Sequence, residues 1–225
     1  MLGRLVAALF PMVCPGCGRA ADPVCAGCAA GLVRPPPTPP PEGVDAWVAP
    51  YAYEGVAREL VARVKYRGAH AATRWLAAAM VEEVARLAIA DRLDAVTWAP
   101  TTASRRRTRG FDHAELLARP IARAFGLTAT SSLHRLPGPP QTGLPAADRR
   151  RGPAFAAPGR TPRVVLLVDD VATTGATLAA AATALRGCGT SRIAAVTAAR
   201  TPAPSTSGRP ARTLPNDSGT TRRRR

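Results

Sequence analysis

Apolar residues follow two different spacings along the chain between about Val44 and Arg200. Short, mainly apolar runs typical of buried strands occur at 46–53, 94–99, 164–168 and 192–198, and residues 128–133 are a further candidate strand. Stretches with helical spacing or many alanines separate these runs and predict helices at 56–66, 70–90, 112–125 and 177–186. Such alternation is typical of α/β proteins. We therefore predict an α/β fold, with helices flanking a parallel sheet.

The polar stretches between these elements predict two loops. Residues 101–110 are polar and rich in arginine, and residues 137–162 are rich in Pro, Gly and Arg. Asp112 and Glu115 have the spacing of a capping box, which predicts a helix N-terminus. Pro120 lies inside that helix, so we expect it to kink or shorten the helix.

Composition divides the chain into four parts. Four of the five cysteines lie in residues 1–34, six prolines lie in residues 35–43, and residues 201–225 are rich in Pro, Ser, Thr and Arg. Dense proline predicts a stiff extended linker, and the last stretch has too little apolar surface to order itself. We predict a cysteine module at 1–34, a linker at 35–43, a main domain at 44–200 and a disordered basic tail at 201–225.

Composition and charge narrow the classes of protein. Hydrophobic residues make up 46% of the 225 residues, which excludes wholesale disorder. No apolar run approaches the roughly 20 residues of a membrane-spanning helix, and we expect a cytoplasmic protein. More than half of the net charge of +16 lies in residues 201–225 and in the cluster Arg105, Arg106, Arg107 and Arg109. This charge permits a nucleic-acid or polyphosphate partner without requiring one.

Residues 164–177, Val-Val-Leu-Leu-Val-Asp-Asp-Val-Ala-Thr-Thr-Gly-Ala-Thr, are the most informative stretch. We expect a buried strand to end in two adjacent acids, Asp169 and Asp170, at the edge where open α/β sheets bind ligands. The hydroxyls, backbone N–H groups and helix start that follow suit a phosphate monoester, and Gly175 would let the backbone approach it closely. Paired carboxylates suit ribose hydroxyls or an indirectly held divalent metal. The alternative is an ordinary strand-to-helix turn with a capping threonine.

This stretch resembles the phosphoribosyl pyrophosphate signature of type I phosphoribosyltransferases, a hydrophobic run, Asp-Asp, two residues, then Thr-Thr-Gly-x-Thr. In that family the acids bind the ribose 2- and 3-hydroxyls and the loop binds the 5-phosphate. The resemblance implies catalysis by Asp169 and Asp170 with Mg²⁺, through displacement of pyrophosphate at ribose C1. It also implies binding of phosphoribosyl pyrophosphate by Asp169, Asp170, Val171, Ala172, Thr173, Thr174, Gly175, Ala176 and Thr177.

Further motifs resemble the ComF (GntX-like) family over about residues 1–200. They are the cysteine pairs, the proline-rich stretch and, in this order, Tyr53-Glu54-Gly55, Lys65-Tyr66-Arg67-Gly68, Arg109-Gly110-Phe111, Pro139-Pro140-Gln141 and Arg149-Arg150-Arg151. That family usually has Asn-Gln after Arg-Gly-Phe, where this chain has Asp112-His113. The resemblance implies a link to natural competence, with single-stranded DNA and competence proteins as partners.

The arginine-rich stretch supplies candidates for a diphosphate. In a phosphoribosyltransferase the loop after a strand of this type contacts pyrophosphate, which bidentate guanidinium groups suit. The alternative for each arginine is a solvated basic loop. We expect His113 and His134 to be surface or loop histidines, and no residue identifies itself as a general base. The candidates are Arg105, Arg107 and Arg109, together with Lys65 from the family pattern.

The cysteines form two Cys-x-x-Cys pairs, Cys14 with Cys17 and Cys25 with Cys28. In an intracellular protein this spacing predicts a Cys₄ zinc site. Four thiolates leave no open position for catalysis, so the zinc would be structural. An iron–sulfur cluster, or redox and disulfide roles, are the alternatives.

Three functions follow from these observations. The leading one is a phosphoribosyltransferase-like protein that binds phosphoribosyl pyrophosphate with Mg²⁺ and is linked to uptake of single-stranded DNA. The second is a non-enzymatic nucleic-acid-binding or regulatory module with the same fold. The third is a nucleobase-salvage phosphoribosyltransferase. The sequence does not indicate the acceptor substrate or the oligomeric state.

Overall fold

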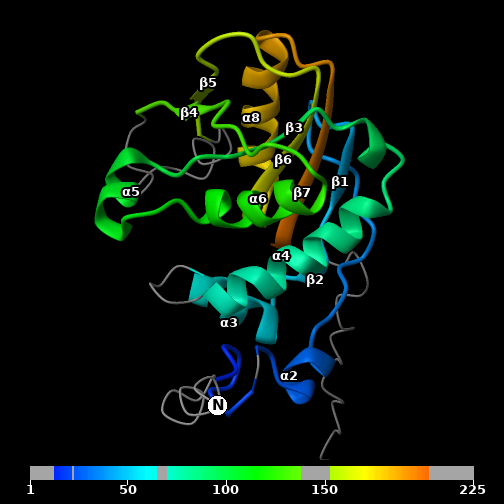
Figure 1. The fold of residues 1–225 in the computed structure, drawn as a ribbon, viewed down its shortest axis with the longest axis vertical. Coiled ribbons are helices and arrows are strands. Elements are labelled where there is room, and N and C mark those ends of the chain that lie inside the picture. Colours follow the sequence, from blue (N-terminus) through cyan, green and yellow to red (C-terminus); the bar gives the residue numbers. More distant parts are fainter. Residues whose placement is uncertain (1–12, 22, 65–69, 138–152, 203–225) are drawn as a thin grey trace, which may run out of the picture.

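A parallel sheet lies at the centre of the computed structural model, which describes residues 13–21, 23–64, 70–137 and 153–202 (Figure 1). The strand order is β1-β7-β6-β3, and β2 pairs with β7 beyond the end of β1. All of these pairs are parallel, as predicted. The strands are β1 (Ala46–Val48), β2 (Tyr51–Ala52), β3 (Ala95–Trp98), β6 (Val164–Ala172) and β7 (Arg192–Arg200).

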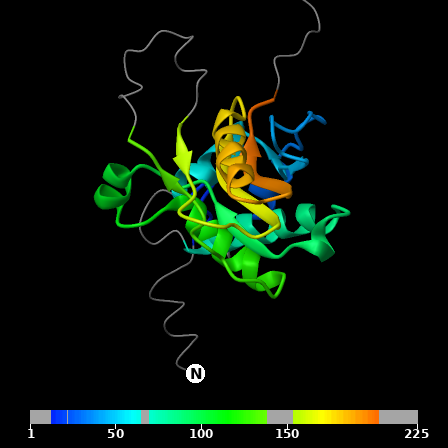
Figure 2. The same ribbon diagram turned by 90° about the horizontal axis from the view of Figure 1, so that it is seen from above.

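Helices cover both faces of this sheet, which confirms the predicted fold class (Figure 2). One face packs against α3 (Gly55–Val64), α4 (His70–Ala85) and α6 (His113–Ala124), and the other packs against α8 (Ala176–Gly187). The remaining described elements are α2 (Ala26–Ala30), a 3₁₀ turn (Ala90–Arg92), α5 (Ala103–Arg109) and an antiparallel pair, β4 (His134–Arg135) with β5 (Phe155–Ala156).

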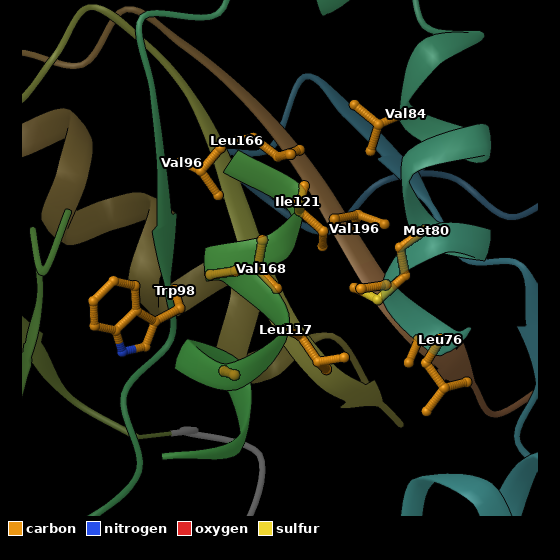
Figure 3. Close-up of a cluster of buried hydrophobic side chains, with 14 of the residues drawn as sticks. Leu76, Met80, Val84, Val96, Trp98, Leu117, Ile121, Leu166, Val168 and Val196 are labelled. Atoms are coloured by element: carbon orange, nitrogen blue, oxygen red, sulfur yellow. The ribbon is translucent and has the colours of Figure 1, made fainter. Parts of the chain in front are cut away.

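Strand β6 is buried on both faces, which explains its unbroken apolar run. Leu166 and Val168 pack with the helices of the α4 and α6 face, where Met80 and Leu117 meet them (Figure 3). Val165 and Leu167 pack on the α8 face. Successive side chains of a strand point to opposite faces. Side chains of consecutive residues farther along β6 therefore also point to opposite faces of the sheet.

Strand β6 is longer than predicted. It continues through Asp169 and Asp170 to Ala172, because its partner β7 extends to Arg200 and the parallel pairing runs along both strands. The predicted end of the strand at these two acids is wrong, because β6 ends at Ala172. They lie inside it, and their carboxylates are therefore held by a paired backbone and not by a free loop.

The arginine-rich stretch 101–110 is also not the predicted loop, since residues 103–109 form α5. Thr102 caps the helix by accepting a hydrogen bond from the Arg105 amide, and Gly110 ends it with a φ of 82°. No buried residue lies in this helix. Because α5 has no apolar stripe, the hydrophobic pattern gave no sign of it.

Other boundaries differ in smaller ways. The predicted strand 46–53 divides into β1 and β2, the helix predicted at 70–90 ends at Ala85, and the loop predicted at 137–162 includes β5. The predicted strand 128–133 makes only a single bridge, from Ala129 to Val96. Its hydroxyl side chains bond locally instead, with 2.9 Å between Thr130 Oγ1 and Ser132 Oγ.

Helix α6 begins where the capping box predicts, with Asp112 as its N-cap. Pro120 does not shorten it, and the helix continues to Ala124. Packing of the fully buried Leu117 and Ile121 against the sheet compensates for the hydrogen bond that proline cannot donate. Among the helices in the described ranges, none is long and apolar enough to cross a membrane.

Candidate functional site

A polar cavity of about 380 Å³ opens where β3 and β6 end, beside the start of α8. Charged side chains from separate parts of the chain meet in it. The acids are Asp112, Asp169 and Asp170, and the bases are Arg105, Arg109 and Arg135, with His113 beside them. A second cavity of about 520 Å³ lies at the opposite ends of the strands and is mainly apolar, with Leu87 and Ile89 in its wall. The chemistry is therefore concentrated at the carboxyl end of the sheet.

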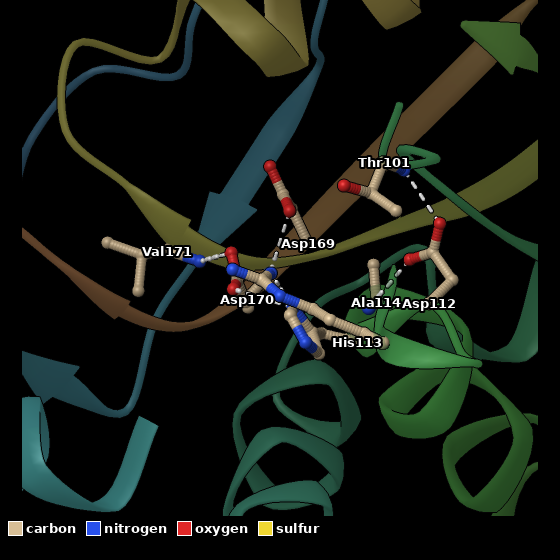
Figure 4. A network of polar contacts seen from close by, with 8 residues as sticks. Thr101, Asp112, His113, Ala114, Asp169, Asp170 and Val171 are labelled. Atoms are coloured by element: carbon tan, nitrogen blue, oxygen red, sulfur yellow. Dashed lines mark hydrogen bonds and ion pairs between the residues drawn. The ribbon is translucent and has the colours of Figure 1, made fainter. Parts of the chain in front are cut away.

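The carboxylates of Asp169 and Asp170 lie at the base of the polar cavity (Figure 4). Asp169 accepts a hydrogen bond from the Asp170 amide at 2.8 Å, and Asp170 accepts one from the Val171 amide at 2.7 Å. Burial, followed by the charge of Asp170, raises the pKa of Asp169 well above its usual range. Folding therefore favours protonated Asp169, and this stabilisation is lost as the pH rises through its folded-state pKa.

Asp112 joins the two helices that border the cavity. Its carboxylate accepts hydrogen bonds from the Thr101 amide at 2.6 Å, before α5, and from the Ala114 amide at 3.1 Å, in α6. Burial raises the pKa of Asp112, and the amide hydrogen bonds oppose that shift. The predicted cap is thus confirmed, and the same side chain also fixes the start of the arginine-bearing segment.

His113 is buried, so the expectation of a surface or loop histidine is wrong. It is 5% exposed, and its ring packs edge-on against Phe111 with centroids 5.4 Å apart. Its Nδ1 lies 3.5 Å from an Arg109 guanidinium nitrogen and 3.9 Å from Asp170 Oδ2. The cap at Asp112 directs this first residue of α6 toward the end of β6. His134, in contrast, is exposed on β4.

Arg105 and Arg109 line the cavity, and Arg107 does not. Arg105 and Arg109 are four residues apart and so share one side of α5, and Arg107 lies off that side. Lys65 lies outside the described residues.

Arg135 was not predicted, although its side chain is half-buried and lines the cavity. Its guanidinium carbon lies 5.8 Å from the centroid of the Phe155 ring, on the neighbouring strand. Burial, with the charge of Arg105, lowers the pKa of Arg135, while Asp169 and Asp112 oppose the shift. The two guanidinium groups repel each other, so an anion bound between them would be stabilised by both. Only the pairing of β4 with β5 brings Arg135 here, and local sequence carries no signal of it.

Residues 173–175 connect β6 to α8, and together with the first two residues of α8 they form one wall of the site. Thr173 and Thr174 are exposed, Gly175 is the N-cap of α8, and Thr177 lines the cavity. Gly175 supplies no capping side chain, and the Ala176 amide in the first turn of α8 donates to Thr174 Oγ1 at 3.3 Å. Backbone N–H groups at this helix N-terminus, with the threonine hydroxyls, are suited to an anion.

Gly175 is required for two reasons that the structure makes explicit. Its φ of 77° lies in the left-handed region, and a Cβ built on it would lie 2.8 Å from Pro41 Cγ. The close neighbour in the structure is thus Pro41, in the proline-rich segment 35–43, and the close approach of a ligand stays a prediction. Arg200 holds the same segment by donating to the Pro36 carbonyl, with its guanidinium over the Trp47 ring.

The four N-terminal cysteines are clustered, with their Sγ atoms all within 4.8 Å of one another. A tetrahedral zinc site with Zn–S bonds of about 2.3 Å needs sulfur atoms about 3.8 Å apart. The separation between Cys17 Sγ and Cys25 Sγ is 3.6 Å, so these residues fit a zinc ion. In the described ranges this is the only cluster of three or more potential metal-ligating side chains.

Hydrogen bonds also prepare the cluster for a cation. Burial raises the pKa of the Cys14 thiol, but amide hydrogen bonds from Cys25, Cys17 and Gly16 outweigh it and lower the pKa to about 6. Burial and the neighbouring thiols raise the pKa of Cys28 to about 12. Ionising all four thiols together therefore requires a positive charge among them.

The cysteine cluster packs against α3. A Cβ on Gly16 would lie 3.2 Å from Val56 Cγ1, and one on Gly31 would lie 3.4 Å from Val56 Cγ2, in α3. Ala52, in β2, donates its amide to the Val33 carbonyl at 2.8 Å. The small module is thus attached to the sheet through α3 and β2.

Comparison with protein-family models finds the phosphoribosyl transferase domain over residues 116–221. This range includes β6, the loop 173–177 and α8, and it leaves the cysteine cluster and α5 outside. A comparison with curated proteins finds no match. The match covers less than half of the chain, and the parallel sheet flanked by helices fits a phosphoribosyltransferase-like α/β fold. An N-terminal cluster of four cysteines accompanies it.

We expect one zinc ion per chain in the purified protein, because the four sulfurs fit a tetrahedral site. Cys28→Ser should lose this ion, whereas Cys188→Ser, which removes the cysteine outside the cluster, should keep it. Metal content measured by inductively coupled plasma mass spectrometry checks both. Zinc retained by the Cys28 variant, or iron in the wild type, would contradict the assignment.

We expect Gly175→Ala to lower the free energy of unfolding by about 1–2 kcal/mol from its left-handed backbone alone. The contact with Pro41 should add to this loss, so the double variant Gly175→Ala/Pro41→Ala should recover part of it. Gly159→Ala is the matched control, because no atom lies within 4 Å of its added Cβ. Urea unfolding measures all three, and equal losses at 159 and 175 would refute this explanation.

Proposed function

We propose that this protein binds phosphoribosyl pyrophosphate with Mg²⁺ and transfers its phosphoribosyl group. The observation that carries the proposal is a single cavity with three kinds of binding group on separate walls. An acid pair lies at its base, a threonine-rich helix N-terminus forms one wall, and arginines reach it from α5 and β4. These groups match a ribose, a phosphate and a diphosphate in turn. The phosphoribosyl transferase domain match over residues 116–221 supports the same function.

The loop 173–177 and the first turn of α8 would bind the 5-phosphate. Thr177 lines the cavity, and the positive end of the helix dipole points toward the same region. Asp169 and Asp170 would bind the ribose hydroxyls from the base of the cavity. A carboxylate there accepts hydrogen bonds from a diol and stabilises the positive charge that develops on the ribose as pyrophosphate leaves.

Arg105, Arg109 and Arg135 would neutralise the leaving pyrophosphate. Guanidinium groups from two directions can form bidentate hydrogen bonds with both phosphates. Mg²⁺, when bound, would supply further charge neutralisation, with Asp169 or Asp170 and the diphosphate as its oxygen donors. The carboxylates fit this ion only in part, since the acids of the cavity, as the structure describes them, do not come together as three potential metal ligands. The substrate must therefore complete the coordination.

The cysteine cluster connects this activity to the ComF-like organisation that the sequence resembles. We propose that the protein acts in the cytoplasm, in the handling of imported single-stranded DNA during natural competence. The support is the combination of four clustered cysteines, a proline-rich segment and a phosphoribosyltransferase domain in one chain. A nucleobase-salvage enzyme has the same cavity requirements and differs only in its acceptor.

The second candidate is a nucleic-acid-binding module without catalysis. Arg106 and Arg107 favour it, because both are exposed on α5 outside the cavity lining. A phosphate backbone could contact this side of the helix. Such binding should weaken steeply as salt concentration rises, whereas the cavity would not be needed for it.

Calorimetric titration with phosphoribosyl pyrophosphate and Mg²⁺ tests the proposed function. We expect Asp169→Asn/Asp170→Asn to bind about 100-fold more weakly than wild type, and Arg135→Ala about tenfold more weakly. The double variant relieves the repulsion between the two carboxylates, but it also removes a charge that supports Arg135. Thermal unfolding must therefore show that it is folded before weak binding is assigned to the site.

Asp91→Asn, in the exposed 3₁₀ turn, is the control and should bind as wild type does. No binding by the folded, metal-loaded wild type would contradict the proposed function. Salt-sensitive binding of a thymidine oligonucleotide by that same protein would then favour the second candidate.

A further inference from the structure

The ring of His113 lies between Arg109 and Asp170. Arg109 needs a hydrogen-bond acceptor and Asp170 needs a donor, and both face the same ring nitrogen, Nδ1. Its Nδ1 is 3.5 Å from a guanidinium nitrogen of Arg109 and 3.9 Å from Oδ2 of Asp170. Arginine can only donate hydrogen bonds, and an ionised carboxylate can only accept them. One ring nitrogen of a neutral imidazole either accepts or donates. His113 Nδ1 can therefore satisfy Arg109 or Asp170, but not both at once.

The surroundings of His113 restrict the movement of its ring. His113 is 5% exposed and packs edge-on against Phe111, so the ring has little freedom to turn toward solvent. Arg109 is the last residue of α5, and Asp170 lies in β6. The shorter of the two distances is to Arg109, so the structure favours Nδ1 as an acceptor from that guanidinium.

The two neighbours belong to different halves of the proposed ligand. Arg109 would contact the pyrophosphate, and Asp170 would contact a ribose hydroxyl, so this inference rests on the proposed function. When phosphate oxygens take the donors of Arg109, the hydrogen bond to Nδ1 is lost. The Nδ1–H tautomer then becomes favourable, because it can donate to Asp170.

We propose that His113 is a positioning residue that couples the pyrophosphate-binding arginine to the ribose-binding acid through its Nδ1. With Arg109 free of ligand, Nδ1 accepts from it. With Arg109 bound to pyrophosphate, Nδ1 carries the proton and orients Asp170 for the ribose. The proton moves from one ring nitrogen to the other by exchange with solvent. Binding at one half of the cavity thus prepares the other half.

The tautomer is measurable without any ligand. Long-range proton–nitrogen NMR spectra of the histidine rings should show His113 with unprotonated Nδ1 in the wild type. Arg109→Ala should move the proton to Nδ1, whereas Arg106→Ala, on the same helix but outside the cavity lining, should not. The same tautomer in wild type and Arg109→Ala would overturn the proposal, whatever the protein binds.

The coupling itself is tested with pyrophosphate and ribose 5-phosphate, each titrated calorimetrically with Mg²⁺ in the presence and absence of the other. In the wild type each should strengthen binding of the other about fivefold or more. Glutamine has a donor and an acceptor on separate atoms, so His113→Gln should still bind both compounds. The factor by which each compound strengthens binding of the other should fall toward one, which means no coupling. His134→Gln, at the exposed histidine on β4, should retain the wild-type coupling.

Undiminished coupling in a folded His113→Gln variant would overturn the role of His113, even with both compounds binding. Failure of the wild type to bind either compound would instead contradict the proposed function. The tautomer shift in Arg109→Ala separates the two failures, because it depends on the contacts of the ring alone.

Discussion

The carboxylate of Asp169 is buried at the end of the central strand, directly beside the charge of Asp170, and the surrounding protein has to hold it there. Both effects raise the pKa of Asp169, so its ionised form opposes folding. The paired backbones of β6 and β7 and the packed cores on both faces of the sheet provide the compensating stability. Three arginines, Arg105, Arg109 and Arg135, line the same cavity and place positive charge opposite the acids.

The elements around β6 hold the groups that surround Asp169 in place. Asp112 ties the start of α5 to α6, which brings Arg105 and Arg109 over the acids. The proline-rich segment packs Pro41 against Gly175 and so supports the turn that starts α8. The cysteine cluster is attached at α3 and β2, outside the cavity, consistent with a role in stability and not in the chemistry of the site.

Features encoded within a few consecutive residues were predictable. The apolar run of β6, the small residues after it and the spacing of the cysteines each act locally, and the structure has them where the pattern indicates. Helix α5 was missed although Thr102 and Gly110 are a capping pair, because a fully polar helix has no hydrophobic period. Arg135 and the burial of His113 depend on the pairing of β4 with β5 and on the packing of α6, which no local pattern specifies.

The central claim is that the carboxyl end of β6, the start of α8 and the α5 arginines form one binding site. Hydrogen–deuterium exchange of the full chain with phosphoribosyl pyrophosphate and Mg²⁺ tests it most directly. Slower exchange should occur together in the amides of 101–114 and 171–177, while the cysteine cluster should exchange as it does without ligand. Slower exchange confined to the cysteine cluster or to the apolar cavity at the opposite end of the strands, or no change at all, would contradict the claim.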